Sequence, residues 1–395
     1  MRVLLQRDFR LLFLGQAAST IGDRIVFVAL ALYVTDIGSP TDVGVVLAAT
    51  TLPLVGFLLI GGVWADRLPR HRVMIVTDVF RGALHTVLAV LIFTGAVEIW
   101  HLAVIGALFG TAEAFFRPAY TGLVPQTVPE EMIQDAKAAG GTLETTADFA
   151  GPALATALVL GVGAGWAFAV DAATFFVSAL LLAGVRPRAR GEAPERRTWL
   201  EELREGWDQV RSRAWIWATV AAFCVAVLAC FGPWTTLGPT VAEREYGSTG
   251  YFGLLAAVLG AGTLLGAVVG FRYAPRHPLR AGFVWCLPWP ATTVLFALGA
   301  PMALLVPLFT VAGVGLALFG IWWEVALAQR VPPHLLSRVS AYDWMGSLAL
   351  LPLGYLLSGP LGEALGEPAV LAAGSGLALL ALAAGLCVRE TWRLQ

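Results

Sequence analysis

Two carboxyl side chains, Glu144 and Asp148, stand four positions apart in an otherwise apolar stretch of the sequence. Residues at i and i+4 lie on the same face of an α-helix. At 1.5 Å per residue, Asp148 would lie about 16 Å inside a helix that begins near residue 137. Two carboxylates this close in a medium of low dielectric constant disfavour double ionisation, so one of them is expected to hold a proton. A carboxyl group that gains and loses a proton is the chemistry that proton coupling requires.

Two further charged pairs stand in apolar stretches. Glu113 and Arg117 are four positions apart, which permits an ion pair on one helix face; a self-neutralised structural pair and a proton-coupling site fit this spacing equally well. Asp23 and Arg24 are adjacent and point about 100° apart on a helix, so each needs another partner or a water-filled cavity. The proton-coupling candidates are therefore Asp23, Glu113, Arg117, Glu144 and Asp148.

For two other sites a structural interpretation is favoured. A charge at the centre of a bilayer costs about 3 kcal/mol or more, so it needs a partner or a water-filled cavity. Asp78 and Arg81 are three positions apart near one end of an apolar stretch, and we expect them to form a structural ion pair. Asp171 is expected to be a structural hydrogen-bonding residue.

Tryptophans gather in the second half of the chain. Many of these rings are expected to lie at the membrane interface, where tryptophan is enriched. The candidates for a substrate cavity are Trp234, Trp289, Trp322, Trp323 and Trp344. An aromatic wall opposite an acidic one suits an amphipathic organic molecule, including one with a positive charge. It does not suit a sugar, because Gln16 is nearly the only amide side chain within the apolar stretches.

The composition is that of a polytopic membrane protein. Of the 395 residues, 58% are hydrophobic and 13% charged, about half the charged fraction of soluble domains. The four cysteines show no metal-binding or disulfide spacing. The sequence also lacks a phosphate-binding loop and the HExxH motif of metalloproteases. We therefore expect no enzymatic activity, no catalytic residue, no metal, no cofactor and no nucleic-acid partner.

Twelve apolar runs are long enough to cross a membrane as helices, since a span needs about 20 residues. They cover 11–35, 43–65, 73–95, 101–124, 137–161, 166–185, 214–240, 250–271, 280–299, 302–328, 340–361 and 367–388. With the N-terminus in the cytosol, inner loops and tails receive 22 of the Lys and Arg residues, whereas outer loops receive Arg244 alone. The positive-inside rule then predicts cytosolic termini. We predict an all-α protein of the cell (inner, cytoplasmic) membrane without a cleaved signal.

The chain divides into two halves that resemble each other. QTVPEEM at 126–132 recurs as QRVPPHL at 329–335, and Gly151 recurs as Gly354 at the same offset. We predict a six-helix bundle over 1–185, a cytosolic linker over 186–213 and a second six-helix bundle over 214–395. The linker contains an amphipathic segment, which either lies on the inner leaflet or packs on the bundle. Transporters duplicated in this way bind substrate near the midplane, between the bundles.

The cluster GGVWADRLPRHRV at 61–73 lies on the predicted cytosolic side between the second and third spans. Gly62, Asp66 and Arg67, followed by the basic Arg70 and Arg72, resemble motif A of the major facilitator superfamily. This resemblance implies a cytosolic clasp, meaning polar contacts that hold the two halves together and break when the inside opens. FFRPAYTGLVPQTVPEE, DAATFFVSAL and GDR at 22–24 further resemble macrolide-efflux and enterobactin-exporter-like proteins. Gly151-Pro152 resembles the core of the helix-5 motif of antiporters.

The resemblance and the buried charges together predict a secondary transporter, acting as a monomer, with a small-molecule substrate and protons as the coupling ion. It would export an amphipathic or hydrophobic compound, drug-like or siderophore-like, by alternating access. A lipid or lysophospholipid transporter of the same fold is the alternative. An intramembrane enzyme and a channel are less favoured, because no catalytic motif is present and a channel needs no clasp.

Overall fold

The computed structural model describes residues 2–188, 199–270, 272–273, 275–388 and 390, and within these ranges all regular structure is helical. The chain forms two compact units, Met1–Ala193 and Pro194–Gln395. The division falls inside the predicted linker. The prediction of an all-α membrane fold is confirmed.

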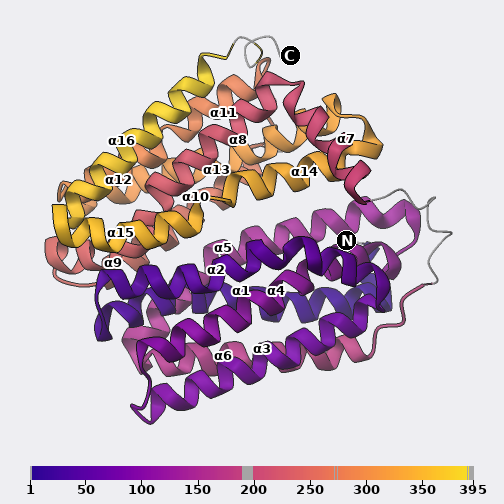
Figure 1. Ribbon diagram of the computed structural model, residues 1–395, viewed down its shortest axis with the longest axis horizontal. Helices are drawn as coiled ribbons and strands as arrows, with labels where there is room; N and C mark the ends of the chain where they lie inside the picture. Colours follow the sequence, from indigo (N-terminus) through magenta and orange to yellow (C-terminus); the bar gives the residue numbers. More distant parts are fainter. Residues whose placement is uncertain (1, 189–198, 271, 274, 389, 391–395) are drawn as a thin grey trace. The chain divides into compact units, whose positions relative to one another are not determined.

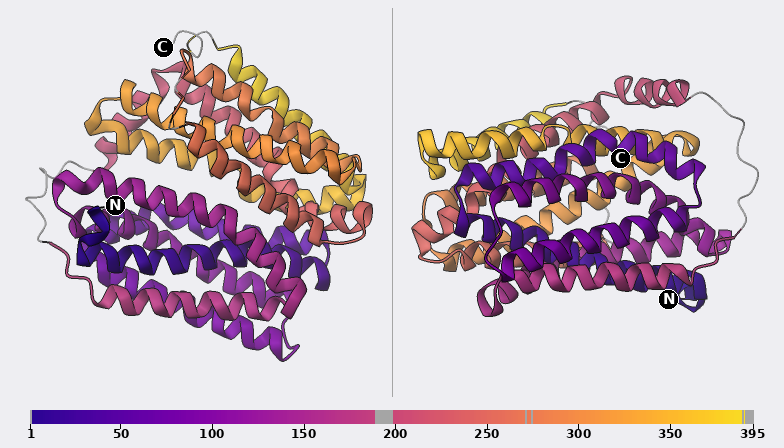
Figure 2. Two further views of the ribbon diagram at one scale, coloured as in Figure 1. Left: turned by 180° about the vertical axis from the view of Figure 1, so that it is seen from behind. Right: turned by 60° about the horizontal axis from the view of Figure 1, so that its bottom comes forward.

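The first unit contains six long helices. They are α1 (Arg7–Ile37), α2 (Pro40–Arg67), α3 (Arg70–Phe93), α4 (Ile99–Thr127), α5 (Ile133–Val162) and α6 (Ala164–Ala183), with short 3₁₀ turns at Arg2–Leu5 and Glu130–Met132. Each contains one of the first six predicted spans, or nearly all of it. Helix α1 packs between α5 and α6, while α2 lies along α4 and α3 along α6 (Figure 1, with further views in Figure 2). This packing brings the charged residues of five helices into one unit.

The second unit is built from more, shorter helices. They are α7 (Trp199–Arg211), α8 (Ala214–Ala226), the π-helical turn η3 (Val227–Phe231), α9 (Gly232–Tyr246), α10 (Gly250–Gly270), α11 (Pro278–Cys286), α12 (Pro288–Ala297), α13 (Met302–Arg330), α14 (Pro333–Leu348), α15 (Leu351–Leu365) and α16 (Glu367–Leu386). Among the described residues, eleven helices are long and apolar enough to cross a membrane. The predicted ninth span, 280–299, is divided at Leu287 into α11 and α12. Pro288 has no N–H to bond the carbonyl of Val284 four residues earlier, which explains the break.

The seventh span changes its helical pitch midway, where α8 continues through η3 into α9. The N–H of Gly232 bonds the carbonyl of Val227, five residues earlier, and Pro233 offers no N–H to the turn. The carbonyls of Leu228 and Ala229 approach glycines of two neighbouring helices. An ideal Cβ would lie 2.6 Å from the oxygen of Leu228 if built on Gly354, and 2.0 Å from that of Ala229 if built on Gly374. The π-helical turn therefore fits only against residues without side chains.

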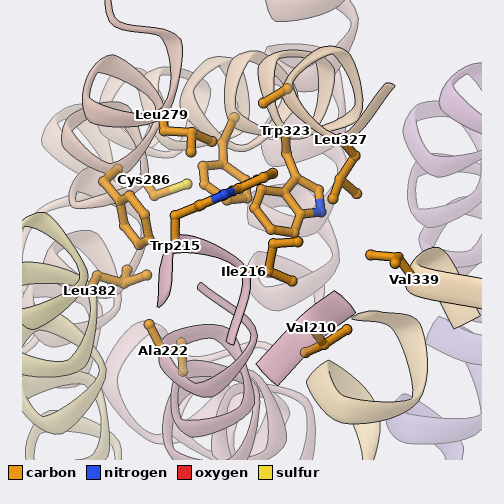
Figure 3. Packing of buried hydrophobic residues seen from close by; sticks show 14 of the residues in the cluster. Val210, Trp215, Ile216, Ala222, Leu279, Cys286, Trp323, Leu327, Val339 and Leu382 are labelled. Carbon is orange, nitrogen blue, oxygen red and sulfur yellow. The ribbon is translucent and has the colours of Figure 1, made fainter. Parts of the chain in front are cut away.

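The core of the second unit is rich in aromatic residues. Figure 3 shows Trp215 and Trp323 packed among aliphatic side chains, and their rings meet edge to face with centroids 5.4 Å apart. Val210 of α7 belongs to the same core, and the ring of Trp207 lies 5.7 Å from that of Tyr342 on α14. These contacts favour the interpretation of α7 as a connector packed on the bundle. The side chains of the other predicted apolar positions on this helix, Leu200 and Leu203, lie outside the described residues.

Candidate functional site

A partly exposed ion pair joins α1 and α5 in the first unit. Nε of Arg24 lies 2.5 Å from Oδ1 of Asp148, and the two side chains are 40% and 47% exposed. Arg24 thus has the separate partner that its position on α1 required. Glu144, one turn before Asp148, lies within electrostatic reach of both partners and of Arg117. The negative charge of Asp148 is therefore neutralised by an arginine on a different helix, α1, which the spacing along α5 alone did not indicate.

Gly151 and Pro152 position this pair. An ideal Cβ on Gly151 would lie 2.2 Å from Cβ of Arg24, closer than real atoms approach, so α1 and α5 can meet here only because residue 151 has no side chain. Pro152 has no N–H for the carbonyl of Asp148 four residues earlier. The helix-5 motif predicted from the sequence therefore lies directly beside the ion pair.

A second group of charges is buried more deeply. Arg81 is 1% exposed and binds two carboxylates: Asp78, at 2.5 Å, and Glu113 of α4. The other carboxylate oxygen of Glu113 lies 2.8 Å from Nε of Arg117. The predicted pairs Asp78–Arg81 and Glu113–Arg117 therefore both form, and Arg81 joins them into one chain with two positive and two negative charges. Because both oxygens of Glu113 contact an arginine, this chain is suited to a fixed structural role.

Three phenylalanine rings surround the guanidinium of Arg81. Its Cζ lies 4.1 Å, 4.3 Å and 5.6 Å from the ring centroids of Phe116, Phe175 and Phe109. A cation over an aromatic face is attracted by the ring, more strongly where water is excluded. The rings therefore compensate part of the cost of burying an arginine inside a helix bundle.

His85 is a residue that the sequence analysis did not single out. Its Nδ1 lies 2.5 Å from Oδ2 of Asp171 on α6, and Asp171 is fully buried. Asp171 is thus the hydrogen-bonding residue that was predicted. A signal for His85 was present in the sequence, since it follows Asp78 by seven positions and Arg81 by four, so that the three share one face of α3.

Asp23 faces this buried group rather than the Arg24–Asp148 pair. Its Oδ1 is buried and accepts no hydrogen bond within the described part of the chain. The side chain lies within electrostatic reach of Asp171, Arg81 and Glu113. Asp23 and Arg24 therefore interact with different groups of charged residues, as the angle of about 100° between adjacent helical residues predicted.

The basic cluster at the start of α3 contacts the same unit. Nη1 of Arg70 donates a hydrogen bond of 2.5 Å to the carbonyl of Gly122 on α4, whereas Arg72 is exposed. The side chains of Asp66 and Arg67 lie outside the described part of the chain, as do the surroundings of Gly62, so the predicted cytosolic clasp stays a prediction.

Four of the five tryptophans proposed for a substrate cavity are described, and all four are buried in the second unit. Trp234 packs against Phe252, Phe296 and Phe309, and Trp289 is also buried.

Two of these rings have polar partners. Nε1 of Trp322 donates to the carbonyl of Tyr273 at 3.3 Å, and Nε1 of Trp323 donates to Oδ2 of Asp343 at 2.8 Å. The side chain of Trp344 lies outside the described residues. A cavity role for the five tryptophans stays a prediction.

Metal chemistry has no visible support in the part of the chain that the structure describes. No three or more His, Cys, Asp or Glu side chains come together there as a metal site requires. The cysteines Cys224, Cys230, Cys286 and Cys387 are all free thiols.

Known proteins resemble this chain along most of its length. Residues 12–349 match the model of the Major Facilitator Superfamily. The multidrug efflux pump Tap of Mycolicibacterium fortuitum is 27% identical over 348 residues, covering 83% of this chain and 82% of the relative. Macrolide efflux protein A of Streptococcus pyogenes is 23% identical over 382 residues, covering 91% of this chain and 90% of the relative. These relatives bear out the resemblance to macrolide-efflux proteins.

Solved structures show the same fold at low identity. A bacterial homologue of the human lysosomal transporter Spinster, in an inward-facing and unoccupied conformation, has a TM-score of 0.69 at 19% identity, covering 97% of this chain and 94% of that one. A POT family transporter in complex with 5-aminolevulinic acid has a TM-score of 0.74 at 11% identity, covering 98% and 96%.

Proposed function

Because this chain belongs to the Major Facilitator Superfamily, and is thus a multi-pass membrane transporter, we propose that it exports a small amphipathic or hydrophobic compound by alternating access and is driven by protons. The proposal places it in the cell membrane as a monomer with both termini in the cytosol. Relatives named as a multidrug efflux pump and a macrolide efflux protein support export of a drug-like compound.

The observation that carries this proposal is the half-exposed ion pair between Arg24 of α1 and Asp148 of α5. A proton on Asp148 cancels the negative charge and with it the attraction between the two helices. The pair therefore has two states, one paired and one protonated, as a coupling site requires. Glu144 offers Arg24 a second carboxylate one turn away when Asp148 is neutral.

Glu113 and Arg117 serve this mechanism less well, because Arg81 and Arg117 occupy both carboxylate oxygens of Glu113. We assign Glu113 and Arg117 a fixed structural role, and we assign proton coupling to the carboxylates of α5. The clasp of Asp66 and Arg67 would complete the cycle by opening and closing the cytosolic side.

The test is transport into proteoliposomes with and without an imposed pH gradient. The compound panel includes macrolides, other amphipathic drugs and a lysophospholipid, so that the lipid alternative is measured alongside. We expect drug accumulation that depends on the gradient and that Asp148→Asn uncouples. Asp135→Asn, an exposed residue in the first turn of the same helix, is the matched control. Accumulation indifferent both to the gradient and to Asp148→Asn would remove the coupling mechanism, and accumulation of lysophospholipid alone would replace the proposed substrate.

A further inference from the structure

We propose that His85 and Asp171 are positioning residues for transport, acting through α1 to hold Arg24 in register with Asp148. The inference rests on the proposed coupling role of that ion pair. Neither His85 nor Asp171 contacts Arg24 or Asp148 in the structure, so the effect must pass through the backbone of α1.

The His85–Asp171 pair is held rigidly. Nδ1 and Oδ2 are 2.5 Å apart. The imidazole stacks on Phe109, with centroids 4.6 Å apart and planes 4° apart, and meets Phe168 edge to face at 5.6 Å. With the Asp171 side chain as the acceptor, the hydrogen of this bond lies on Nδ1 of the imidazole. A hydrogen bond between two buried groups is strengthened by the low local dielectric, so both the ring and the carboxylate are fixed in place.

The carboxylate of Asp171 lies directly against α1. An ideal Cβ on Gly22 would lie 2.1 Å from Oδ1 of Asp171 and 2.7 Å from Oγ1 of Thr174. Oγ1 of Thr174 in turn donates to the backbone carbonyl of Asp171 at 2.7 Å. The backbone of α1 therefore packs directly on a polar surface whose shape the His85–Asp171 pair determines.

Helix α1 connects Gly22 to the Arg24–Asp148 ion pair. Gly22 and Arg24 are two residues apart, so their directions differ by about 200° around the helix. Gly22 faces α6, whereas Arg24 faces α5 and packs directly against Gly151 there. Helix α1 is thus a spacer of fixed width between Asp171 and Asp148. When the Asp171 carboxylate rotates, α1 moves, and the short contact of Arg24 with Asp148 changes with it.

Two substitutions of His85 separate this role from simple packing. His85→Asn retains an N–H donor close to the position of Nδ1 but loses the ring, whereas His85→Phe retains the stacked ring but loses the donor. We expect His85→Phe to reduce the maximal transport rate about tenfold or more, the scale of a lost hydrogen bond to a charged group, and His85→Asn to stay within about threefold of the unchanged protein. A role in packing alone predicts the opposite order, and that order would overturn the inference.

A double-mutant cycle with Asp148→Asn tests the route through the ion pair. If His85 acts by positioning Arg24 for Asp148, His85→Phe adds little further loss once Asp148 is neutral, less than about twofold. Full additivity of the two losses overturns the positioning role and leaves the proposed coupling intact. Normal transport by Asp148→Asn alone would overturn the coupling and this inference together. Expression in the membrane and thermal stability of each variant are measured in parallel, so that rates are compared per folded molecule.

Discussion

Arg81→Met removes a cation that binds both Asp78 and Glu113. Glu113 keeps Arg117 as a partner, so the carboxylate left without its cation is that of Asp78, which is fully buried. Removing one partner of a buried ion pair costs about 3–5 kcal/mol, and the cation–π contacts of the guanidinium are lost as well. At about 1.4 kcal/mol per tenfold change, the ratio of folded to unfolded protein should fall by about two to four orders of magnitude.

The assay is thermal unfolding of the purified protein in detergent. Arg81→Met should show a clearly lower midpoint, while Asp78→Asn combined with Arg81→Met should recover much of the loss, because the buried carboxylate that lost its cation is then absent as well. Arg204→Met, an exposed arginine of α7, is the control for loss of a surface charge. The reasoning is refuted by an Arg81→Met protein as stable as the control, or by a double variant no more stable than Arg81→Met alone.

Three further outcomes are expected. Gly151→Ala should lower the transport rate strongly with little loss of membrane insertion, because the added Cβ would lie 2.2 Å from Cβ of Arg24; equal rates in parallel uptake assays would contradict the close approach of α1 and α5. Asp66→Asn should leave insertion intact but cut transport sharply, and normal transport would argue against the cytosolic clasp. A maleimide reagent should label Cys387, which is exposed, far faster than the buried Cys230, as mass spectrometry of the labelled native protein can measure; comparable rates would mean that the core of the second unit is open.

Composition and spacing were sufficient for the fold class and for contacts within one helix. Arg81 pairs with Asp78, and Arg117 with Glu113, because residues three or four positions apart meet on any helix. Hydropathy alone gave one span over 280–299, because the run remains apolar throughout, whereas the prolines of CLPWP at 286–290 indicate the break that lies at Leu287.

Contacts between helices could not be predicted in the same way. The partner of Arg24 is 124 positions away, and only the packing of α1 on α5 brings it close. The like charges Glu144 and Asp148 suggested repulsion because the sequence displays neighbours along α5 and not the cation on α1. His85 was missed for the same reason, since its role depends on α3 lying along α6.

The π-helical turn in the seventh span affects how side chains beyond it are assigned to a face. An α-helix advances about 100° per residue, so a turn that closes over five residues instead of four displaces the pattern that follows by one position. Periodicity extrapolated from α8 into α9 therefore assigns Trp234 to the wrong face. Because the π-helical turn inserts one residue, Trp234 lies on the face that its preceding neighbour would occupy in an uninterrupted α-helix. A scanning mutagenesis profile of this span should therefore show two sensitive stripes, out of phase by one residue, with the offset beginning at Gly232.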